Sequence, residues 1–333
     1  MGHPVKKPAL RPGRGLVAAA ALVALVCVPG ALSAQQEELA AGCATAQPAA
    51  VRQFCNLVAE AIEIAQPRVG LAATAGNPVP GTASTLGMRL GAIPRVSVAA
   101  RVTGVWVDLP PIRDIGGTKM DGMIVPALGA NAAVGVLRGF SPAPTVGGVG
   151  SLDLLGSFSV IPVPEGEGFR DDSPVAWGIG ARVGLLRESF TVPGISISGM
   201  YHRLSNFEFG DPTFAREASF FDVQDYSVLS ARAAISKQLL VFGLAAGVGY
   251  DRYSSDVRFG VQGLGSPIAV EGFSTDRVMA FANATLSFLI LHLVAEAGWQ
   301  SGADDIGLEI PANVDSDVEN GSFFGSIAVR LAI

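Results

Sequence analysis

Apolar residues alternate with small or polar residues along much of this chain, in segments of about a dozen residues. From residue 194 onward, the connections between segments are short near 237–240 and 289–291 and long at 210–222, 256–273 and 303–321. A two-residue alternation is typical of β-strands, and short turns that alternate with long loops are typical of an up-and-down barrel that crosses a membrane. The pattern therefore predicts an all-β, antiparallel transmembrane β-barrel.

The same alternation predicts about 12 strands, with about 10 to 14 possible. The first hairpin is the shortest, and residues 77–81, which include Pro78 and Pro80, would form its turn. An even strand number places both chain ends on the side of the short turns. The strands are expected at 68–75, 84–91, 95–108, 127–139, 147–160, 174–187, 194–208, 223–237, 241–255, 273–288, 291–302 and 322–333.

Alternation also assigns residues to the two faces of the barrel wall. In segment 95–108, Val98 and Val102 would face lipid and Arg101 the lumen; in segment 322–333, Ile327 would face outward and Arg330 inward. Inward basic residues outnumber inward acidic ones, which predicts a lumen that prefers anions. The side chains expected to line this lumen are Arg89, Arg101, Asp153, Arg182, His202, Arg232, Asn283, Glu296 and Arg330.

Several aromatic residues fall near the ends of the expected strands, among them Trp106, Tyr201, Tyr253 and Trp299. Aromatic rings are common at the two lipid–water interfaces of membrane barrels. Rings at strand ends are also found capping a protein core, so both interpretations stay open at this point.

Two other architectures produce apolar segments of similar length. Residues 278–299 are long enough to cross a bilayer as a helix, but Asn283, His292 and Glu296 would be costly at mid-bilayer, and the polar positions recur with a period of two. A soluble β-sandwich would also alternate, but its buried face would carry larger side chains than the Ser, Gly and Ala residues on the polar face here. The barrel accounts for both observations.

The first 34 residues are typical of a secretory signal peptide. Four basic residues precede an apolar run at 16–28, and the small residues Ser33 and Ala34 follow it. Cleavage after Ala34 would remove those four basic residues and no acidic one, so the formal net charge would change from -6 to -10. An acidic exported chain argues against a nucleic-acid partner. The strand pattern then continues without a linker over 68–333, which predicts one barrel domain.

A different segment, residues 35–67, separates the signal peptide from the barrel. Cys43 and Cys55 are the cysteines that remain after cleavage, and in an exported chain they predict one disulfide bond. A helix is expected over 48–66, because its apolar residues recur at helical spacing and Pro67 would end it. This segment would either cap the barrel on the periplasmic side or enter its mouth as a plug.

Candidate chemistry is sparse. After cleavage the histidines are His202 and His292, which are expected at different heights of the barrel and therefore apart. A lone inward histidine is more often solvated than catalytic, and His, Cys and carboxylate residues show no metal-ligand spacing. We therefore expect neither an enzyme nor a cofactor.

An acidic loop lies between the last two strands. Carboxylates in a flexible loop can hold a hard cation, but the spacing here differs from that of an EF-hand, and a solvated outer loop explains the same residues. The acidic residues of this outer loop are Asp304, Asp305, Glu309, Asp315, Asp317 and Glu319.

With its signal peptide, loop pattern and alternating terminal segment 323–333, the chain resembles the broad class of bacterial outer-membrane β-barrel proteins. The resemblance implies an outer-membrane location in a Gram-negative bacterium, contact with membrane lipid and lipopolysaccharide, and insertion by the barrel-assembly machinery. Members of the class commonly end in an aromatic residue, whereas this chain ends in Ile333. Fatty-acid transporters of the class carry an N-terminal helical hatch, which is the plug arrangement.

Two functions follow from this sequence. The first is a channel or transporter for small solutes, in which the inward arginines line a water-filled path. The second is a structural or surface-binding barrel, whose interior is held shut by ion pairs and whose long acidic outer loops contact a partner or lipopolysaccharide.

Overall fold

The structure, a computed structural model, describes residues 39, 41–87, 94–114, 121–143, 146–162, 168–170, 173–302, 309–311, 314 and 320–333. One long helix precedes the strands in this part of the chain, and no helix there is both long and apolar enough to cross a membrane. The elements are α3 (Ala49–Thr74), β1 (Val96–Leu109), β2 (Asp121–Leu137), β3 (Ser151–Val160), β4 (Val175–Leu186), β5 (Gly194–Leu204), β6 (Phe207–Gly210), β7 (Ser219–Leu239), β8 (Phe242–Val261), β9 (Ile268–Phe288), β10 (Leu291–Gln300) and β11 (Ser322–Ala332).

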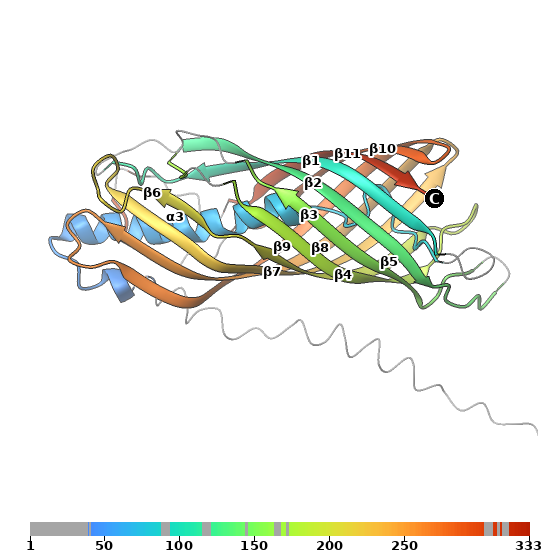
Figure 1. The fold of residues 1–333 in the computed structure, drawn as a ribbon, viewed down its shortest axis with the longest axis horizontal. Coiled ribbons are helices and arrows are strands. Elements are labelled where there is room, and N and C mark those ends of the chain that lie inside the picture. Colours follow the sequence, from blue (N-terminus) through green and yellow to red (C-terminus); the bar gives the residue numbers. More distant parts are fainter. Residues whose placement is uncertain are drawn as a thin grey trace, which may run out of the picture.

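The strands form a closed antiparallel barrel (Figure 1). Ten strands follow one another around the ring, because β5 pairs with β7 and β1 pairs with β11. The short strand β6 pairs with β7 beyond the end of β5 and is additional to the ring. Antiparallel closure leaves no open sheet edge in the ring, which is the condition for a sheet to cross a bilayer.

The two ends of the barrel differ. At one end, which we call the short-turn end, residues 240–241 and 289–290 join long strands. The first strand of the ring begins at this end, and the last strand ends there. At the other, the long-loop end, longer segments such as 110–120 and 301–321 connect the strands. The C-terminus lies at the short-turn end, away from the start of α3 (Figure 1).

The expected strand number was too high by one hairpin. Residues 68–74 belong to α3, and residues 84–87 lie outside any strand; residues 88–91 lie outside the described part of the chain. Pro67 does not end the helix but lies inside it. The helix continues because Val69 and Leu71 are buried against the barrel wall, and such packing outweighs the local cost of a proline. The remaining ten expected strands correspond to the ten strands of the ring.

The outer face carries the apolar band that lipid requires. On β9, outward positions from Val278 to Phe288 are apolar or alanine. At about 3.3 Å per residue and a tilt of about 40° this interval spans about 25 Å along the membrane normal, which is the height of the apolar band of membrane barrels. The face assignments for 95–108 and 322–333 are therefore confirmed. Exposed members of the band include Val98, Val102, Leu128, Leu154, Ile179, Leu229, Ile235, Leu244, Val248, Leu286, Leu293, Ile327, Val329 and Leu331.

Aromatic side chains mark the edge of this band that is nearer the long-loop end. Trp106, Tyr201 and Trp299 are partly exposed on the outer face, and the next outward positions on their strands are polar. For Tyr253 the core interpretation holds instead, because its ring is fully buried on the inner face. The edge separates the membrane-spanning barrel from an extension toward the long-loop end.

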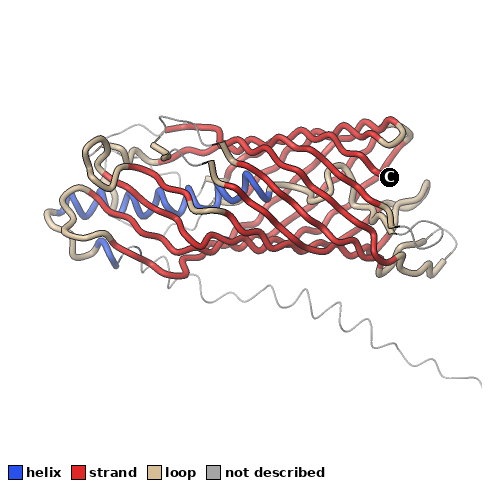
Figure 2. Tube along the Cα trace, viewed as in Figure 1, coloured by secondary structure: helices blue, strands red, loops and turns tan. Residues whose placement is uncertain are grey.

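This extension, which we call the rim, is built from strands where long loops were expected. Strands β7, β8 and β9 continue past the apolar band, so most of 256–273 and the last residues of 210–222 are strand (Figure 2). The alternation changes its meaning there: Val257 and Phe259 are buried inside, whereas Asp256 and Arg258 point outward. The rim has a dry interior and a polar exterior, as expected of structure that leaves the membrane.

Candidate functional site

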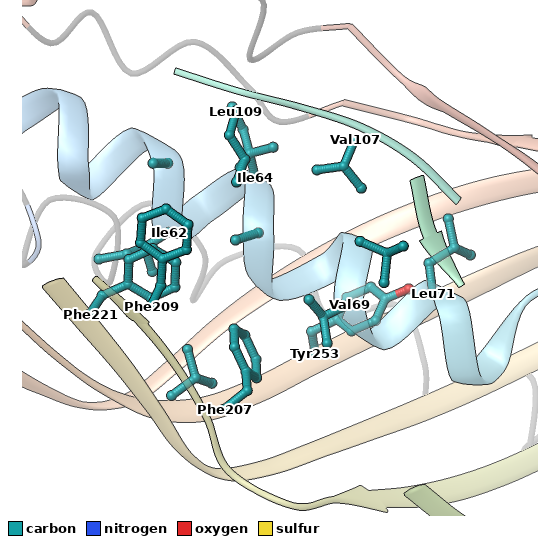
Figure 3. Close-up of a cluster of buried hydrophobic side chains, with 14 of the residues drawn as sticks. Ile62, Ile64, Val69, Leu71, Val107, Leu109, Phe207, Phe209, Phe221 and Tyr253 are labelled. Atoms are coloured by element: carbon teal, nitrogen blue, oxygen red, sulfur yellow. The ribbon is translucent and has the colours of Figure 1, made fainter. Parts of the chain in front are cut away.

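Helix α3 lies inside the barrel and fills the half nearest the long-loop end (Figures 1 and 2). Its apolar side chains pack against inward residues from both sides of the ring, as Figure 3 shows for Ile62 and Ile64. The wall contributes Val107 and Leu109 from β1, together with Phe207, Phe209, Phe221 and Tyr253 from β6, β7 and β8. The helix of this segment therefore lies within the lumen, the position of a plug.

The predicted disulfide is present. Cys43 and Cys55 are joined with a Cα–Cα distance of 5.7 Å, and both are fully buried. Beside them, Asn56 Nδ2 donates to the backbone oxygen of Glu309 at 2.9 Å, and Arg52 lies 3.7 Å from the Glu309 carboxylate. The disulfide therefore joins residues 43 and 55 of this segment, and the contacts with Glu309 hold the start of α3 at the long-loop end. Asp304, Asp305, Asp315, Asp317 and Glu319 of the predicted acidic loop lie outside the described residues, as do Arg89 and the predicted signal peptide.

Residues 75–87 continue from α3 through the remaining lumen to the short-turn end. We call residues 49–87 the plug. Beyond the helix they contain small residues, turns and positive-φ glycines, including Gly76 (φ +68°) and Gly81 (φ +80°). Their polar backbone groups need partners, and the inner wall supplies them.

An ion pair on the wall holds the end of α3. Arg232 donates to both carboxylate oxygens of Asp251, at 2.8 and 2.9 Å, and also to the backbone oxygens of Thr74 (3.0 Å) and Gly76 (3.2 Å). The guanidinium thus satisfies carbonyls at the helix C-terminus, where a positive charge is favourable. Tyr253 Oη also donates to Asp251, at 3.2 Å.

A second ion pair holds the residues that follow the helix. Arg101 and Glu296 form a salt bridge, and Glu296 Oε2 accepts from the backbone N–H of Asn77 at 3.0 Å and from Asn283 Nδ2 at 3.1 Å. A Cβ at Gly76 would lie 1.7 Å from Glu296 Oε1. Glycine is therefore required at position 76 both for its backbone conformation and for the approach of this carboxylate.

A third ion pair holds the part of the plug nearest the short-turn end. Arg182 donates to Asp153 Oδ2 from Nε (3.1 Å) and Nη2 (2.7 Å), and from Nη1 to the backbone oxygen of Thr82 at 3.2 Å. Asp153 in turn accepts from the backbone N–H groups of Leu86 (3.0 Å) and Gly87 (3.4 Å). The carboxylate is fully buried, so these donors replace its water shell.

These contacts close the lumen along its length. Nearer the long-loop end, Glu63 of the helix lies 3.6 Å from Arg277 of β9. Gln66 donates to Ser255 at 2.8 Å and accepts from Thr275 at 3.0 Å. Two cavities beside the end of α3 each offer only about 10 Å³ to the centre of a water molecule, which is room for about one water. Neither is a continuous pore.

The structure places the expected lumen residues on the inner face, with the exception of Arg89, whose position is not described. It brings Asp153 to Arg182, and Glu296 to Arg101 and Asn283. Asp251 and Glu63 were not expected among the inward acids. Asp251 could have been found from the alternation, because it shares a face with Tyr253 and Gly249. Glu63 had no such signal, because its partner is distant in the sequence.

His202 is buried on the inner face, with its Nδ1 3.4 Å from Ser157 Oγ. His292 lies at the short-turn end, so the two histidines do not meet. Within the described ranges, no group of three or more His, Cys, Asp or Glu residues is arranged to hold a metal ion.

The outer surface of the rim carries charges of both signs in ion pairs. Arg170 lies 2.6 Å from Glu208, and Arg203 pairs with Asp225. Glu208 also faces Asp222 across the β6–β7 pair. Partial burial raises the pKa of Asp222, and the facing Glu208 raises it further. The rim is therefore a polar surface that water and salt can reach.

No protein-family model and no curated protein matches the sequence. Similar solved structures include the translocator domain of autotransporter NalP from Neisseria meningitidis, with a TM-score of 0.40, 12% identity and coverage of 73% of this chain and 89% of that one. The transport unit of the autotransporter AIDA-I from Escherichia coli aligns with a TM-score of 0.37, 8% identity and coverage of 82% and 99%. Ail, the attachment invasion locus protein of Yersinia pestis, aligns with a TM-score of 0.29, 9% identity and coverage of 72% and 98%.

The chain is a β-barrel of the outer-membrane class. The closed antiparallel ring and the apolar outer band carry this assignment, which indicates no particular family within the class.

Proposed function

We propose that this protein is a closed outer-membrane barrel that presents its rim, and the disulfide-bonded start of the plug, at the cell surface. The observation that carries the proposal is the plug. Three buried ion pairs of the wall each bond directly to backbone groups of residues 74–87, and α3 fills the remaining lumen.

The orientation follows from the ends of the barrel. Barrels of this class keep both termini of the ring and the tight turns in the periplasm, and their longer segments outside. The short-turn end would then be periplasmic, and the rim and the disulfide would face the exterior. Lipopolysaccharide would surround the base of the rim, the barrel-assembly machinery would insert the chain, and a surface partner would meet the rim. The barrel would have no catalytic role.

Surface labelling tests the orientation. An epitope inserted at Gly265, which a Cβ could occupy without any contact within 4 Å, should be detected on intact cells. The same epitope at Phe190, which is 94% exposed in a short-turn-end loop, should be detected only after the outer membrane is permeabilised. The reverse pattern would show that the barrel is inverted.

Conductance tests the closure. Refolded protein in a planar bilayer should show no regular single-channel steps, while its shift in gel mobility on heating confirms that the barrel is folded. Regular steps from the folded protein would overturn the proposal of a closed barrel.

A channel for small solutes with anion preference is a second candidate. It is favoured by one observation: Arg330 on the inner wall has no acidic partner within ion-pair distance among the described residues. Such a channel would require the plug to move, so it should conduct only after the plug is destabilised. A salt-gradient reversal potential measured on an Asp251→Leu variant would show whether that path prefers anions.

A further inference from the structure

The wall of the lumen contains one arginine that the plug does not explain. Arg330 of β11 is only 6% exposed and points inward. Its Nε atom is buried and has no hydrogen-bond partner, and no ion pair forms between its guanidinium and a described carboxylate. Arg101, Arg182 and Arg232 each have a carboxylate. An arginine cannot lose its proton in a protein, so a buried guanidinium needs a negative partner or water.

His292 is the neighbour of Arg330 across the β10–β11 pair. Gln238 Nε2 donates to Ser287 Oγ at 3.0 Å, and Ser287 Oγ lies 2.8 Å from His292 Nδ1. Ser287 accepts from Gln238 and still has its one hydroxyl proton to give to His292 Nδ1. We assign this arrangement, in which the proton of the neutral ring sits on Nε2. His292 thus offers an N–H donor beside the guanidinium.

The charges around this pair of donors do not neutralise it. The charged groups that act on Arg330 are Arg182 and Glu188. Arg182 is already bound to Asp153. Glu188 lies outside ion-pair distance of Arg330, and its carboxylate accepts from Ser236 Oγ at 3.1 Å and from the backbone N–H of Gln238.

We propose that Arg330 and His292 form a binding site for a small oxyanion at the short-turn end of the lumen. The ligand would be of the size of inorganic phosphate or a short carboxylate, with one oxygen on the guanidinium and another on His292 Nε2. His292 is only half-buried among the described residues, so the His292 side of the site adjoins solvent at the short-turn end. The site is independent of whether the barrel conducts.

The experiment is isothermal titration calorimetry of the full chain, refolded in a detergent that contains no phosphate. The probes are inorganic phosphate, glycerol phosphate and acetate. Glycerol phosphate represents the headgroup ester of a membrane lipid, so a preference between the first two separates a free phosphate from a lipid source, and acetate tests a carboxylate ligand. The parent should bind at least one probe with a saturable isotherm.

Two variants test the donors, and a third is the control. Arg330→Gln should weaken binding about tenfold or more, which corresponds to about 1.4 kcal/mol, and His292→Phe should weaken it by a smaller factor. Arg203→Gln removes the same charge from the outer surface of the rim and should bind like the parent. A heat-dependent shift in gel mobility checks that each variant is folded.

The absence of saturable binding of every probe to the parent would overturn the proposal. So would binding that neither Arg330→Gln nor His292→Phe weakens. If Arg330→Gln does not fold, His292→Phe decides alone, because its side chain is half-buried and its loss removes one donor without leaving a buried charge.

Discussion

Replacing Asp251 by leucine should destabilise the folded barrel by about 3–5 kcal/mol, which is the usual cost of removing one partner of a buried ion pair. Asp251 is completely buried (0% exposed), and it accepts two hydrogen bonds from Arg232, one from Tyr253 and a longer one from Gln300. The variant leaves the Arg232 guanidinium in the lumen with backbone carbonyls as its acceptors in place of a carboxylate, those of Thr74, Gly76, Ala231 and Tyr250.

A double variant separates the buried charge from the lost packing. Arg232→Met combined with Asp251→Leu removes both charges and leaves the carbonyls of Thr74 and Gly76 without this donor. At about 0.5–1.5 kcal/mol for each hydrogen bond, the double variant should be about 1–3 kcal/mol less stable than the parent. It should therefore be more stable than Asp251→Leu alone.

The measurement is equilibrium unfolding in denaturant, followed by tryptophan fluorescence, for the parent and the single and double variants. Arg232→Met completes the double-mutant cycle. An Asp251→Leu variant within about 1 kcal/mol of the parent, or a double variant no more stable than that single variant, would refute the reasoning. Either result would mean that water reaches this ion pair, because solvated pairs contribute only about 0–1 kcal/mol.

Three further outcomes are expected. Ile327→Arg should reduce membrane insertion, at a cost of about 2–4 kcal/mol if the side chain lies near the bilayer midplane. Glu271→Arg, on the outer surface of the rim, should insert normally. Equal insertion yields of the two variants would show that the position assigned to the apolar band is wrong. Gly76→Ala should lower stability by more than about 1 kcal/mol because its backbone has positive φ and its Cβ meets Glu296, whereas unfolding of Gly265→Ala, in open space, should match the parent. Cys55→Ser should lower stability by about 2–4 kcal/mol through loss of the disulfide, and an unchanged unfolding midpoint would show that the disulfide does not stabilise the folded barrel.

The barrel strands could be predicted from the sequence because lipid imposes a rule on every second residue. An outward side chain within the band must be apolar, so the alternation of Val98 and Val102 with Arg101 reports the wall directly. The rim escaped this prediction because outside the membrane the rule no longer applies. There Asp256 and Arg258 face water and Val257 faces the core. Because this is the opposite of the pattern in the membrane band, the segment was predicted to be a loop.

The candidate site was only partly predictable. The alternation placed Arg101 and Arg232 inside, but it could not show that each charge is neutralised, because the partners come from other strands. Asp251 shares a face with Tyr253, and a carboxylate cannot face lipid at low cost. The alternation alone could therefore have assigned both side chains to the inner face. The helical state of residues 68–74 could not be read locally. It depends on Tyr226 and Tyr253, whose rings pack where a Cβ at Gly70 would lie.

The plug also bears on the order in which the molecule can form. It precedes β1 in the chain, and β1 meets β11 where the ring closes. The plug makes contacts such as that of Gln66 with Thr275, which are 209 positions apart in the sequence. Contacts of this range form slowly. A plug threaded into a finished cylinder would have to strip water from three buried ion pairs in a confined space. Assembly is simpler if the sheet forms around the plug and the β1–β11 pairing forms last, so that the N-terminal segment serves as a template for the barrel.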